Sequence, residues 1–442
     1  MAGSASDHDS DHTRVFCFVH AADLHLDTPF SGIHESAPFV AEALREASLA
    51  ALDAIVALAL ERDAAFLVVA GDVYDGPERG LRAQLRFRDG LARLADAGIA
   101  SVVVHGNHDP IASGWSAVGS WPDAVTVLGH ETVGLVSIER DGEQIATVQG
   151  ISYATRAVAE NLARRFSRPD GPGLHVGLLH CNVEGAAEGY ADYSPCTLDD
   201  LRSTHLDYWA LGHVHQHRVL AEGTGPGDPW VVYPGNSQAR SPRPSERGAK
   251  GAVVVHVAGG RVTRVEHVAC DAVRFAECAC AIDGIASLDD LEDRLSALGE
   301  EVLEAAAGRS VVVRARLVGR GGLHGELARP GVTDGLLAHL RDAAGSAARF
   351  CWWDALVDES RSGTDLDAVR ARGDFSSDLL ALAESLAGDD AALDALGSEL
   401  VGGVPRLLAR DMHALAGDTG ALRALLEKAT HLALDELGAG EQ

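Results

Sequence analysis

Five short segments of this chain carry carboxylate, imidazole and amide side chains in an order that could hold two metal ions. They are Asp23-Leu24-His25, the GDVYD run at 71–75, the GNHD run at 106–109, His180, and the GHVH run at 212–215. Each follows an apolar run of strand character, and polar residues just past a buried strand lie where open α/β sheets bind ligands. Five such placements in one chain predict a common site.

Two-metal chemistry explains why these residue types occur together. Two divalent cations about 3.5–4 Å apart can clamp the attacking and leaving oxygens of a phosphoryl transfer. Cations that close need a shared anionic ligand, and Asp72 is the natural bridge. Oxygen and imidazole ligands without thiolate suit Mn, Fe or Zn, and a water bound to such cations loses its proton near neutral pH. The segments therefore predict hydrolysis of a phosphoester.

Other polar residues of these segments are candidates for catalysis or for support. His108 lies beside the candidate ligand Asn107 and is free to act on the phosphate. Asp75, three residues after Asp72, could orient that imidazole, because a carboxylate can fix a histidine tautomer. We expect core, supporting or rim positions for the remaining ones: His20, His105, Asp109 and His217.

Alternating strands and helices over residues 14–268 would position these side chains. The apolar runs before the five segments are 15–19, 66–70, 101–104, 174–179 and 208–211. Helical periodicity at 41–61 and 81–97 links the first three of them. Further strand-like runs are 125–129, 132–139, 144–150, 230–233, 251–257 and 262–267, with a hairpin turn at Asp141-Gly142. Two packed sheets flanked by helices are the expected architecture.

The remaining sequence predicts further domains, since 442 residues exceed one typical core. Residues 270–360 are typical of a small α/β domain, 361–373 of a polar linker, and 375–442 of a helical C-terminal region. An apolar stripe in that region would pack against its own domain or dock a partner helix. Its members are Leu422, Leu425, Leu426 and Ala429.

The motif order D-x-H, GDxxD, GNHD, H, GHxH resembles that of the calcineurin-like metallophosphoesterases. The closer resemblance is to their DNA-repair exonuclease branch, the nuclease subunits of SbcCD and Mre11-type complexes, and within it to the YhaO-type subfamily. It is carried by HAADLHLDTPF at 20–30, HCNVEG at 180–185, DYWALGHVH at 207–215 and YPGNSQ at 233–238. The resemblance covers 14–268 well, 270–360 in outline, and nothing specific beyond 365.

The resemblance implies a ligand set, a catalytic residue and a fold. One cation would take Asp23, His25, Asp72 and His215. The other would take Asp72, Asn107, His180 and His213. His108 would be the catalytic histidine, the fold a two-sheet αββα sandwich, and 270–360 a domain that caps the active site. Asn236 stands where the wider branch often has serine, which leaves substrate preference open.

The charge of the chain limits how it could bind DNA. Its formal net charge is −28, and its only lysines are Lys250 and Lys428. Because duplex binding depends on phosphate neutralisation by Lys and Arg, strong unaided binding is not expected. A basic or nucleic-acid-binding partner subunit could hold the substrate instead. Arg240, Arg243 and Arg247 either contact the phosphate backbone near the site or belong to an ordinary solvated loop.

Cysteine usage and apolar content predict a cytoplasmic location. The seven cysteines are scattered, with no CxxC pair, and favour a reduced protein. No stretch approaches the roughly 20 apolar residues of a membrane helix. Residues 1–13 lack the basic and apolar regions of a signal peptide, and we expect a disordered tail there.

The favoured function is a two-metal-dependent phosphodiesterase acting on DNA, a 3′–5′ exonuclease subunit of a repair complex. The DNA assignment rests on the resemblance, which also implies a long coiled-coil ATPase partner; a homodimer stays open. Mn²⁺ is the expected metal, with Fe, Zn and Mg as alternatives. Two other functions remain: hydrolysis of nucleotides or small phosphoesters, which the acidity of the chain keeps open, and a scaffold for an ATPase, which the intact ligand set disfavours.

Overall fold

The computed structural model describes residues 15–28, 38–76, 80–112, 116–184, 193–225, 227–343, 349–364, 366–402 and 418–439. The tail expected at 1–13 lies outside these residues. The chain divides into two compact units. The first comprises Met1–Ala276, Leu303–Val312 and Ser346–Trp352, and the second Glu277–Val302, Val313–Gly345 and Trp353–Gln442. Every predicted ligand falls in the first unit.

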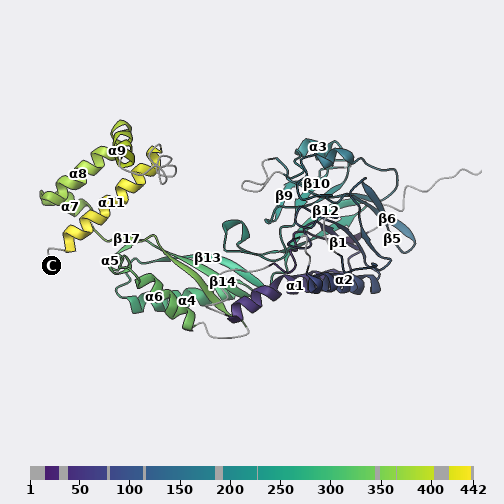
Figure 1. Cartoon of the computed structure of the whole chain (residues 1–442), viewed down its shortest axis with the longest axis horizontal. Coiled ribbons are helices and arrows are strands. Elements are labelled where there is room, and N and C mark those ends of the chain that lie inside the picture. The colour runs from purple at the N-terminus through teal and green to yellow at the C-terminus, as the bar shows by residue number, and fades with distance from the viewer. Residues whose placement is uncertain are drawn as a thin grey trace, which may run out of the picture. The chain divides into compact units, whose positions relative to one another are not determined.

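The first sheet of the first unit has six strands in the order β12-β11-β1-β2-β3-β4; β1 and β12 are labelled in Figure 1. Four neighbouring strands run parallel: β1 (Val15–Ala21), β2 (Phe66–Ala70), β3 (Ala100–Val104) and β4 (Val125–Val127). The antiparallel hairpin of β11 (Gly251–Ala258) and β12 (Arg261–Ala269) pairs with the free edge of β1. The carboxyl ends of the four parallel strands therefore share one edge.

The second sheet has the order β5-β6-β7-β8-β10-β9. Its four central strands are parallel: β6 (Glu143–Gly150), β7 (Leu174–His180), β8 (Tyr208–Gly212) and β10 (Trp230–Tyr233). The edge strands β5 (Gly134–Arg140) and β9 (Arg218–Ala221) are antiparallel to their neighbours. Asp141 and Gly142 join β5 to β6 with φ of 57° and 78°, as a type I′ hairpin turn requires.

Alternating side chains of β1 serve two different cores. Phe16 and Phe18 point between the sheets, where the Phe18 ring stacks on Phe66 with centroids 4.5 Å apart. Val19 and Ala21 point the other way, into the core under helices α1 (Pro38–Glu61) and α2 (Leu81–Asp96). A third core covers the outer face of the second sheet with η2 (Leu162–Arg165) and α3 (Leu198–Arg202). This layering confirms the predicted αββα sandwich flanked by helices.

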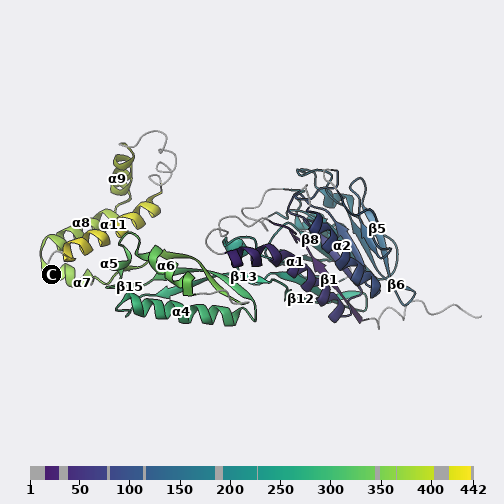
Figure 2. The same ribbon diagram turned by 60° about the horizontal axis from the view of Figure 1, so that its bottom comes forward.

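After the sandwich in the sequence comes a three-stranded sheet in the order β13-β14-β16, whose strand β13 is labelled in Figure 2. Its strands are β13 (Val273–Ala281), β14 (Ser310–Val318) and β16 (Cys351–Asp358). Between them in the chain come α4 (Leu288–Ala305), α5 (His324–Leu327) and α6 (Val332–Ala343). The short strands β15 (Arg320–Gly321) and β17 (Arg361–Ser362) pair in parallel.

The C-terminal region is helical, as predicted, but it begins earlier than predicted. Residues 366–372, expected in a linker, form helix α7 (Leu366–Arg372), because Val369 packs against Leu380 and Leu434. The other helices are α8 (Phe375–Ala387), α9 (Asp390–Gly402) and α11 (Thr419–Ala439). Among the described residues, none of the helices is both long enough and apolar enough to cross a membrane.

The predicted apolar stripe of this region is buried in part. Leu422 is buried, but Leu425 is 43% exposed and Ala429 is exposed as well. Helix α11 instead buries Thr430 and Leu434 along with Leu422. Its buried face is decided by contact with α8 and α9, which the spacing of leucines alone does not reveal.

Candidate metal centre

The seven predicted metal ligands lie at the carboxyl ends of five strands. Asp23 and His25 follow β1, Asp72 follows β2, and Asn107 follows β3. His180 is the last residue of β7, while His213 and His215 follow β8. Because β1 to β3 belong to one sheet and β7 and β8 to the other, the two sheets bring these side chains together along their shared edge.

Four of these residues have a backbone conformation that non-glycine residues rarely adopt. The φ angles of Asp23, His25, Asp72 and His213 are 51°, 42°, 49° and 105°. Each such residue costs on the order of 1–3 kcal/mol, and such positions cluster at functional sites. The strained turns after β1, β2 and β8 therefore indicate that the placement of these side chains matters more than local stability.

The ligand atoms are close enough to share cations. The Nε2 atoms of His25 and His215 lie 3.2 Å apart. The Nε2 of His180 is 3.0 Å from Asn107 Oδ1 and 3.4 Å from Asp72 Oδ2. The same Asp72 oxygen is 3.9 Å from His25 Nε2. Asp72 thus lies between the histidines that the prediction assigned to different metals, as a bridging ligand must.

Three groups of side chains within the described ranges have ligand atoms within 4.8 Å of one another. They are Asp23–His25–His215, His25–Asp72–His108 and Asp23–Asp72–His180. The first group is the predicted ligand set of one cation without the bridging Asp72. The third group contains Asp72 and His180 of the set predicted for the other cation. The His213 ring packs against His180, with centroids 5.3 Å apart. Imidazole nitrogens and carboxylate and amide oxygens in one buried cluster fit two divalent cations.

Glycines of the motifs make room for this crowding. A β-carbon at Gly71 would lie 2.6 Å from His180 Nδ1, and one at Gly106 would lie 2.3 Å from Asp72 Oδ1. A β-carbon at Gly212 would lie 1.9 Å from the carbonyl oxygen of Ala70, which also bonds His180 Nδ1 at 2.9 Å. The glycines before Asp72, Asn107 and His213 are therefore sterically required.

Burial sets the protonation of the site in the absence of cations. Burial, and then the Asp109 carboxylate, raises the pKa of Asp72 to about 6. Burial, and then Asp72, raises the pKa of Asp23 well above its ordinary value. Burial lowers the pKa of His180 to about 4 and that of His25 well below its usual range. Neutral imidazole is the form that binds metal, whereas the carboxylates must release protons when a cation binds.

We therefore expect metal affinity to fall below pH 6. The Asp72 carboxyl, with a pKa of about 6, holds its proton below that pH, so a cation must displace it. One displaced proton costs about tenfold in affinity per pH unit, and the dependence on this group should level off above pH 7. Calorimetric titration with Mn²⁺ at pH 5, 6 and 7.5 measures the slope, and equal affinities would contradict it.

A buried carboxylate behind His215 orients this ligand. Glu246, at the end of η3 (Pro244–Glu246), places Oε1 2.6 Å from His215 Nδ1. Its Oε2 accepts from the Asn236 amide at 2.7 Å and from the Arg240 backbone N–H at 3.2 Å. Burial alone would raise the pKa of Glu246, but the hydrogen bond and charge of His215, together with Lys250 and the Asn236 amide, outweigh it, and the pKa is about 2. The ionised carboxylate holds the proton on Nδ1 and leaves Nε2 for a cation.

Replacing Glu246 should weaken metal binding without removing a ligand. Loss of such a supporting carboxylate typically costs about 10–100-fold in metal affinity or activity, and we expect this for Glu246→Gln. Mn²⁺ titration of the variant measures it, with Glu222→Gln, at an exposed position, as control. An unchanged affinity would show that His215 needs no support.

His108 and Asp75 lie together, but not as a simple carboxylate–imidazole pair. His108 Nδ1 is 3.1 Å from the Asp75 carbonyl oxygen, which accepts its hydrogen bond, and 3.5 Å from Oδ1 of the side chain. The Asp75 carboxylate instead accepts from the Arg240 guanidinium and lies 3.2 Å from His25 Nδ1. Of the arginines left open by the sequence, Arg240 is thus tied to the site through Asp75, while Arg247 donates to the Pro242 carbonyl.

The other polar residues of these segments make hydrogen bonds with the protein around the site. His20 contacts the Tyr208 hydroxyl at 3.0 Å, within the core between the sheets. Asp109 is fully buried, lies 2.8 Å from His105 Nδ1, and accepts from backbone N–H groups of the turns after β2 and β3. His217 contacts the Tyr233 carbonyl at 3.1 Å. Sequence reasoning missed Glu246, whose distance of 31 residues from His215 follows no local pattern.

A two-sheet sandwich with buried histidines and carboxylates at its strand ends is the architecture of a metallophosphoesterase. Residues 17–217 match the calcineurin-like phosphoesterase family, and residues 275–361 match the middle domain of metallophosphoesterase YhaO. The chain is 35% identical over 354 residues to the uncharacterized metallophosphoesterase YhaO of Bacillus subtilis, which covers 79% of this chain and 83% of that protein. The chain therefore belongs to the calcineurin-like metallophosphoesterase family, as the motif order predicted.

More distant similarity extends to proteins of DNA repair. The DNA double-strand break repair protein Mre11 of Thermoplasma acidophilum is 25% identical over 251 residues, which are 55% of this chain and 63% of that protein. The Mre11 protein of Haloferax volcanii is 28% identical over 251 residues, or 54% of this chain and 48% of that one. This chain thus spans less than two thirds of either protein.

Proposed function

We propose that this chain is a two-metal-dependent phosphodiesterase that hydrolyses DNA as a 3′–5′ exonuclease subunit of a cytoplasmic repair complex. The observation that carries hydrolysis is the position of Asp72 Oδ2, within 4 Å of both His25 and His180. The similarity to proteins named for double-strand break repair supports DNA as the substrate. All seven cysteines are free, which suits a reducing compartment.

Different residues of the site would have different roles in hydrolysis. Bound divalent cations would lower the pKa of a water molecule and neutralise charge on the phosphate, and Mn²⁺ suits the mixed nitrogen and oxygen ligands. Asp23, His25 and His215 would hold one cation, Asn107, His180 and His213 the other, with Asp72 between them. His108, held at Nδ1 by the Asp75 carbonyl, would present Nε2 to a phosphate oxygen or to the leaving oxygen.

The direct test compares substrates and metals on one preparation. After removal of metals with EDTA, addition of Mn²⁺ should restore hydrolysis of bis-p-nitrophenyl phosphate and of linear DNA. DNA labelled at either end reveals polarity, because a 3′–5′ exonuclease releases a 3′ label as mononucleotide at the first cut. Mg²⁺ and Zn²⁺ are tested in parallel. Hydrolysis of the small diester with no action on any DNA would refute the DNA assignment and leave the phosphodiesterase assignment intact.

Small phosphoesters are the second candidate substrate, favoured by one observation. The formal net charge of −28 repels long polyanions, whereas a mononucleotide needs no basic surface outside the site. We would measure kcat/KM for cyclic and non-cyclic mononucleotides and for DNA at matched concentration. The substrate class with the higher kcat/KM decides between the two candidates.

A partner that captures DNA would reconcile the acidic charge with DNA cleavage. We propose a coiled-coil ATPase docked through the C-terminal helices. A truncated protein that ends at residue 364 tests this docking. Helices α7, α8 and α11 share one core of Val369, Leu380 and Leu434, so truncation at this point removes that core as a whole. The truncated protein should keep hydrolysis of bis-p-nitrophenyl phosphate within about twofold and lose any stimulation of DNA cleavage by the ATPase.

Both activities are measured on the full-length and the truncated protein, and circular dichroism confirms folding. Equal stimulation of the two would place the docking site elsewhere. Nanomolar binding of duplex DNA by the isolated full-length chain at physiological salt would show that no capturing partner is needed.

A further inference from the structure

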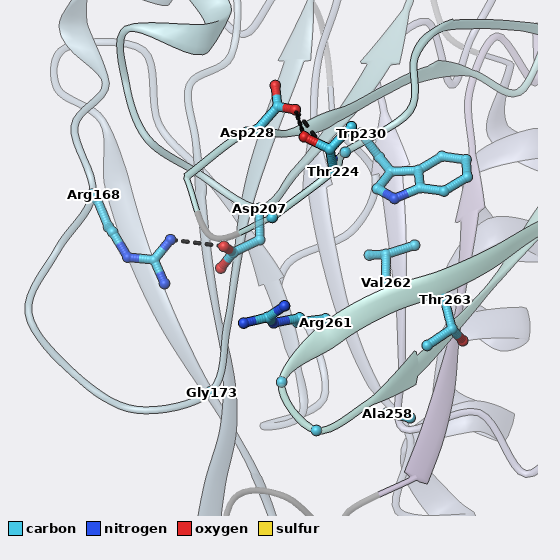
Figure 3. Close-up of a pocket in the computed structure, with 14 residues that line it drawn as sticks. Arg168, Gly173, Asp207, Thr224, Asp228, Trp230, Ala258, Arg261, Val262 and Thr263 are labelled. Carbon is cyan, nitrogen blue, oxygen red and sulfur yellow. Dashed lines mark hydrogen bonds and ion pairs between the residues drawn. The ribbon is translucent and has the colours of Figure 1, made fainter.

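A cavity lies at the edge of the second sheet where β7, β8 and β10 begin, whereas the metal ligands follow the ends of β7 and β8. Figure 3 shows the residues that line it. Its volume is about 420 Å³, within the range of roughly 300–1,000 Å³ of small-molecule sites. Its walls come from the segments that lead into β7, β8 and β10 and from the β11–β12 hairpin; they include Arg168, Asp207, Thr224, Trp230, Arg261 and Val262. Because β7 starts at this edge and ends at His180, the cavity is separated from the metal ligands by the length of the strand.

The charges of the cavity leave one cation without a counterion. Arg168 donates to the Asp207 carboxylate at 2.8 Å, as Figure 3 shows. Asp228 accepts from Thr224 at 2.7 Å and lies 3.6 Å from Arg202. The side chain of Arg261, by contrast, has neither a hydrogen bond nor an ion pair within the described part of the chain. The cavity therefore offers a guanidinium to an anion.

Trp230 supplies the second unsatisfied donor and the apolar wall. Its indole Nε1 has no hydrogen-bond partner among the residues that the structure describes, and its ring lies beside Val262 in Figure 3. A β-carbon at Gly223 would lie 2.9 Å from the Trp230 ring, so this glycine lets the neighbouring loop close against the indole. A flat ring of a ligand could stack or lie edge-on here, with a hydrogen bond to Nε1.

The position of Arg261 is fixed by the backbone. Gly259 and Gly260 connect β11 to β12 with φ of 58° and 69°, the values of a type I′ turn, and Arg261 pairs directly with Ala258. The backbone of Arg261 is therefore held by the β11–β12 ladder, so only its side chain has to become ordered when it binds an anion.

We propose that this cavity binds a nucleoside monophosphate, with the phosphate on Arg261 and the base against Trp230 and Val262. Arginine recognises phosphate through charge-assisted hydrogen bonds, and bases pack readily on aromatic side chains. A planar ring with one anionic group matches a cavity that has one free guanidinium, one free indole N–H and an apolar wall. The inference needs no metal and does not depend on the proposed hydrolysis.

The test is calorimetric titration with deoxyadenosine monophosphate in EDTA, which removes metal-dependent binding. Arg261→Gln should bind about tenfold to a hundredfold more weakly than the unaltered protein, since it loses one charge-assisted hydrogen bond. Arg264→Gln is the matched control on the same strand, because Arg264 pairs with Glu266 and does not line the cavity. Deoxyadenosine and inorganic phosphate should each bind more weakly than the nucleotide.

Trp230 is partly buried, so Trp230→Leu would also disturb packing. Arg261 is exposed at the start of β12, and its substitution therefore carries the test. Trp230→Phe, which keeps a ring but loses Nε1, should bind about threefold to tenfold more weakly. No saturable binding at millimolar nucleotide, or equal affinities of Arg261→Gln and Arg264→Gln, would overturn the inference. Mn²⁺-dependent hydrolysis of bis-p-nitrophenyl phosphate by Arg261→Gln should stay unchanged, which separates failure of this site from failure of the proposed function.

Discussion

Asp72→Asn is expected to remove both metals and to reduce hydrolysis more than about a thousandfold, because the shared ligand is lost to both cations at once. Asp72 Oδ2 lies 3.4 Å from His180 Nε2 and 3.9 Å from His25 Nε2. A neutral amide at this position leaves two divalent cations facing each other without an anion between them, and their repulsion is strong at low dielectric. Metal content after Mn²⁺ loading and gel filtration, with turnover of bis-p-nitrophenyl phosphate, measures both losses.

The stability of the variant distinguishes this explanation from unfolding. Burial raises the pKa of Asp72 to about 6, so at neutral pH the metal-free protein bears the cost of an ionised buried carboxylate. Asparagine carries no such charge and can still accept the hydrogen bond from the His108 N–H, which is 2.9 Å long. The metal-free variant should therefore melt at the same or a higher temperature than the unaltered metal-free protein at pH 7.5. Asp89→Asn, at an exposed position, serves as control. Retention of two metal ions by Asp72→Asn would refute the bridging role.

The sandwich and the ligand positions were predictable because both depend on local patterns. Each ligand segment follows a run of apolar residues, and in parallel strands buried on both faces the carboxyl ends must meet at one edge. Phe18 and Val19 serve opposite cores, which is the alternation that a strand imposes. The glycines of the motifs also mark the crowded turns, as Gly106 shows by its closeness to Asp72.

The supporting residues were not predictable, because their roles depend on contacts made only in the folded chain. Glu246 meets His215 across 31 residues, and Arg240 meets Asp75 across 165. Neither contact has a periodic signal in the sequence, and an arginine in a polar loop is equally typical of a solvated surface. The exposed Leu425 of α11 shows the same limit, since only the packing of neighbouring helices decides which face is buried.

His108→Ala should reduce hydrolysis by about 10²–10⁴-fold while metal content stays near normal. The side chain of His108 is 26% exposed, whereas that of the ligand candidate His25 is 1% exposed, so a substrate phosphate can reach His108. Its Nδ1 donates to the Asp75 carbonyl, so Nε2 can donate to a substrate oxygen when the ring is in its imidazolium form. Turnover with metal analysis of the same sample measures both quantities, and His339→Ala, on the exposed surface of α6, is the control.

The choice of leaving group shows which step His108 assists. If His108 protonates the leaving oxygen, the loss should be far smaller for bis-p-nitrophenyl phosphate, whose phenolate leaves without a proton, than for DNA, whose alkoxide needs one. If His108 instead donates to a phosphate oxygen as charge develops there, both substrates should lose activity to a similar extent. His108 also lies with His25 and Asp72 in one group of ligand atoms within 4.8 Å. A variant that loses its metals as completely as Asp72→Asn would therefore show that His108 is a ligand and not the catalytic histidine.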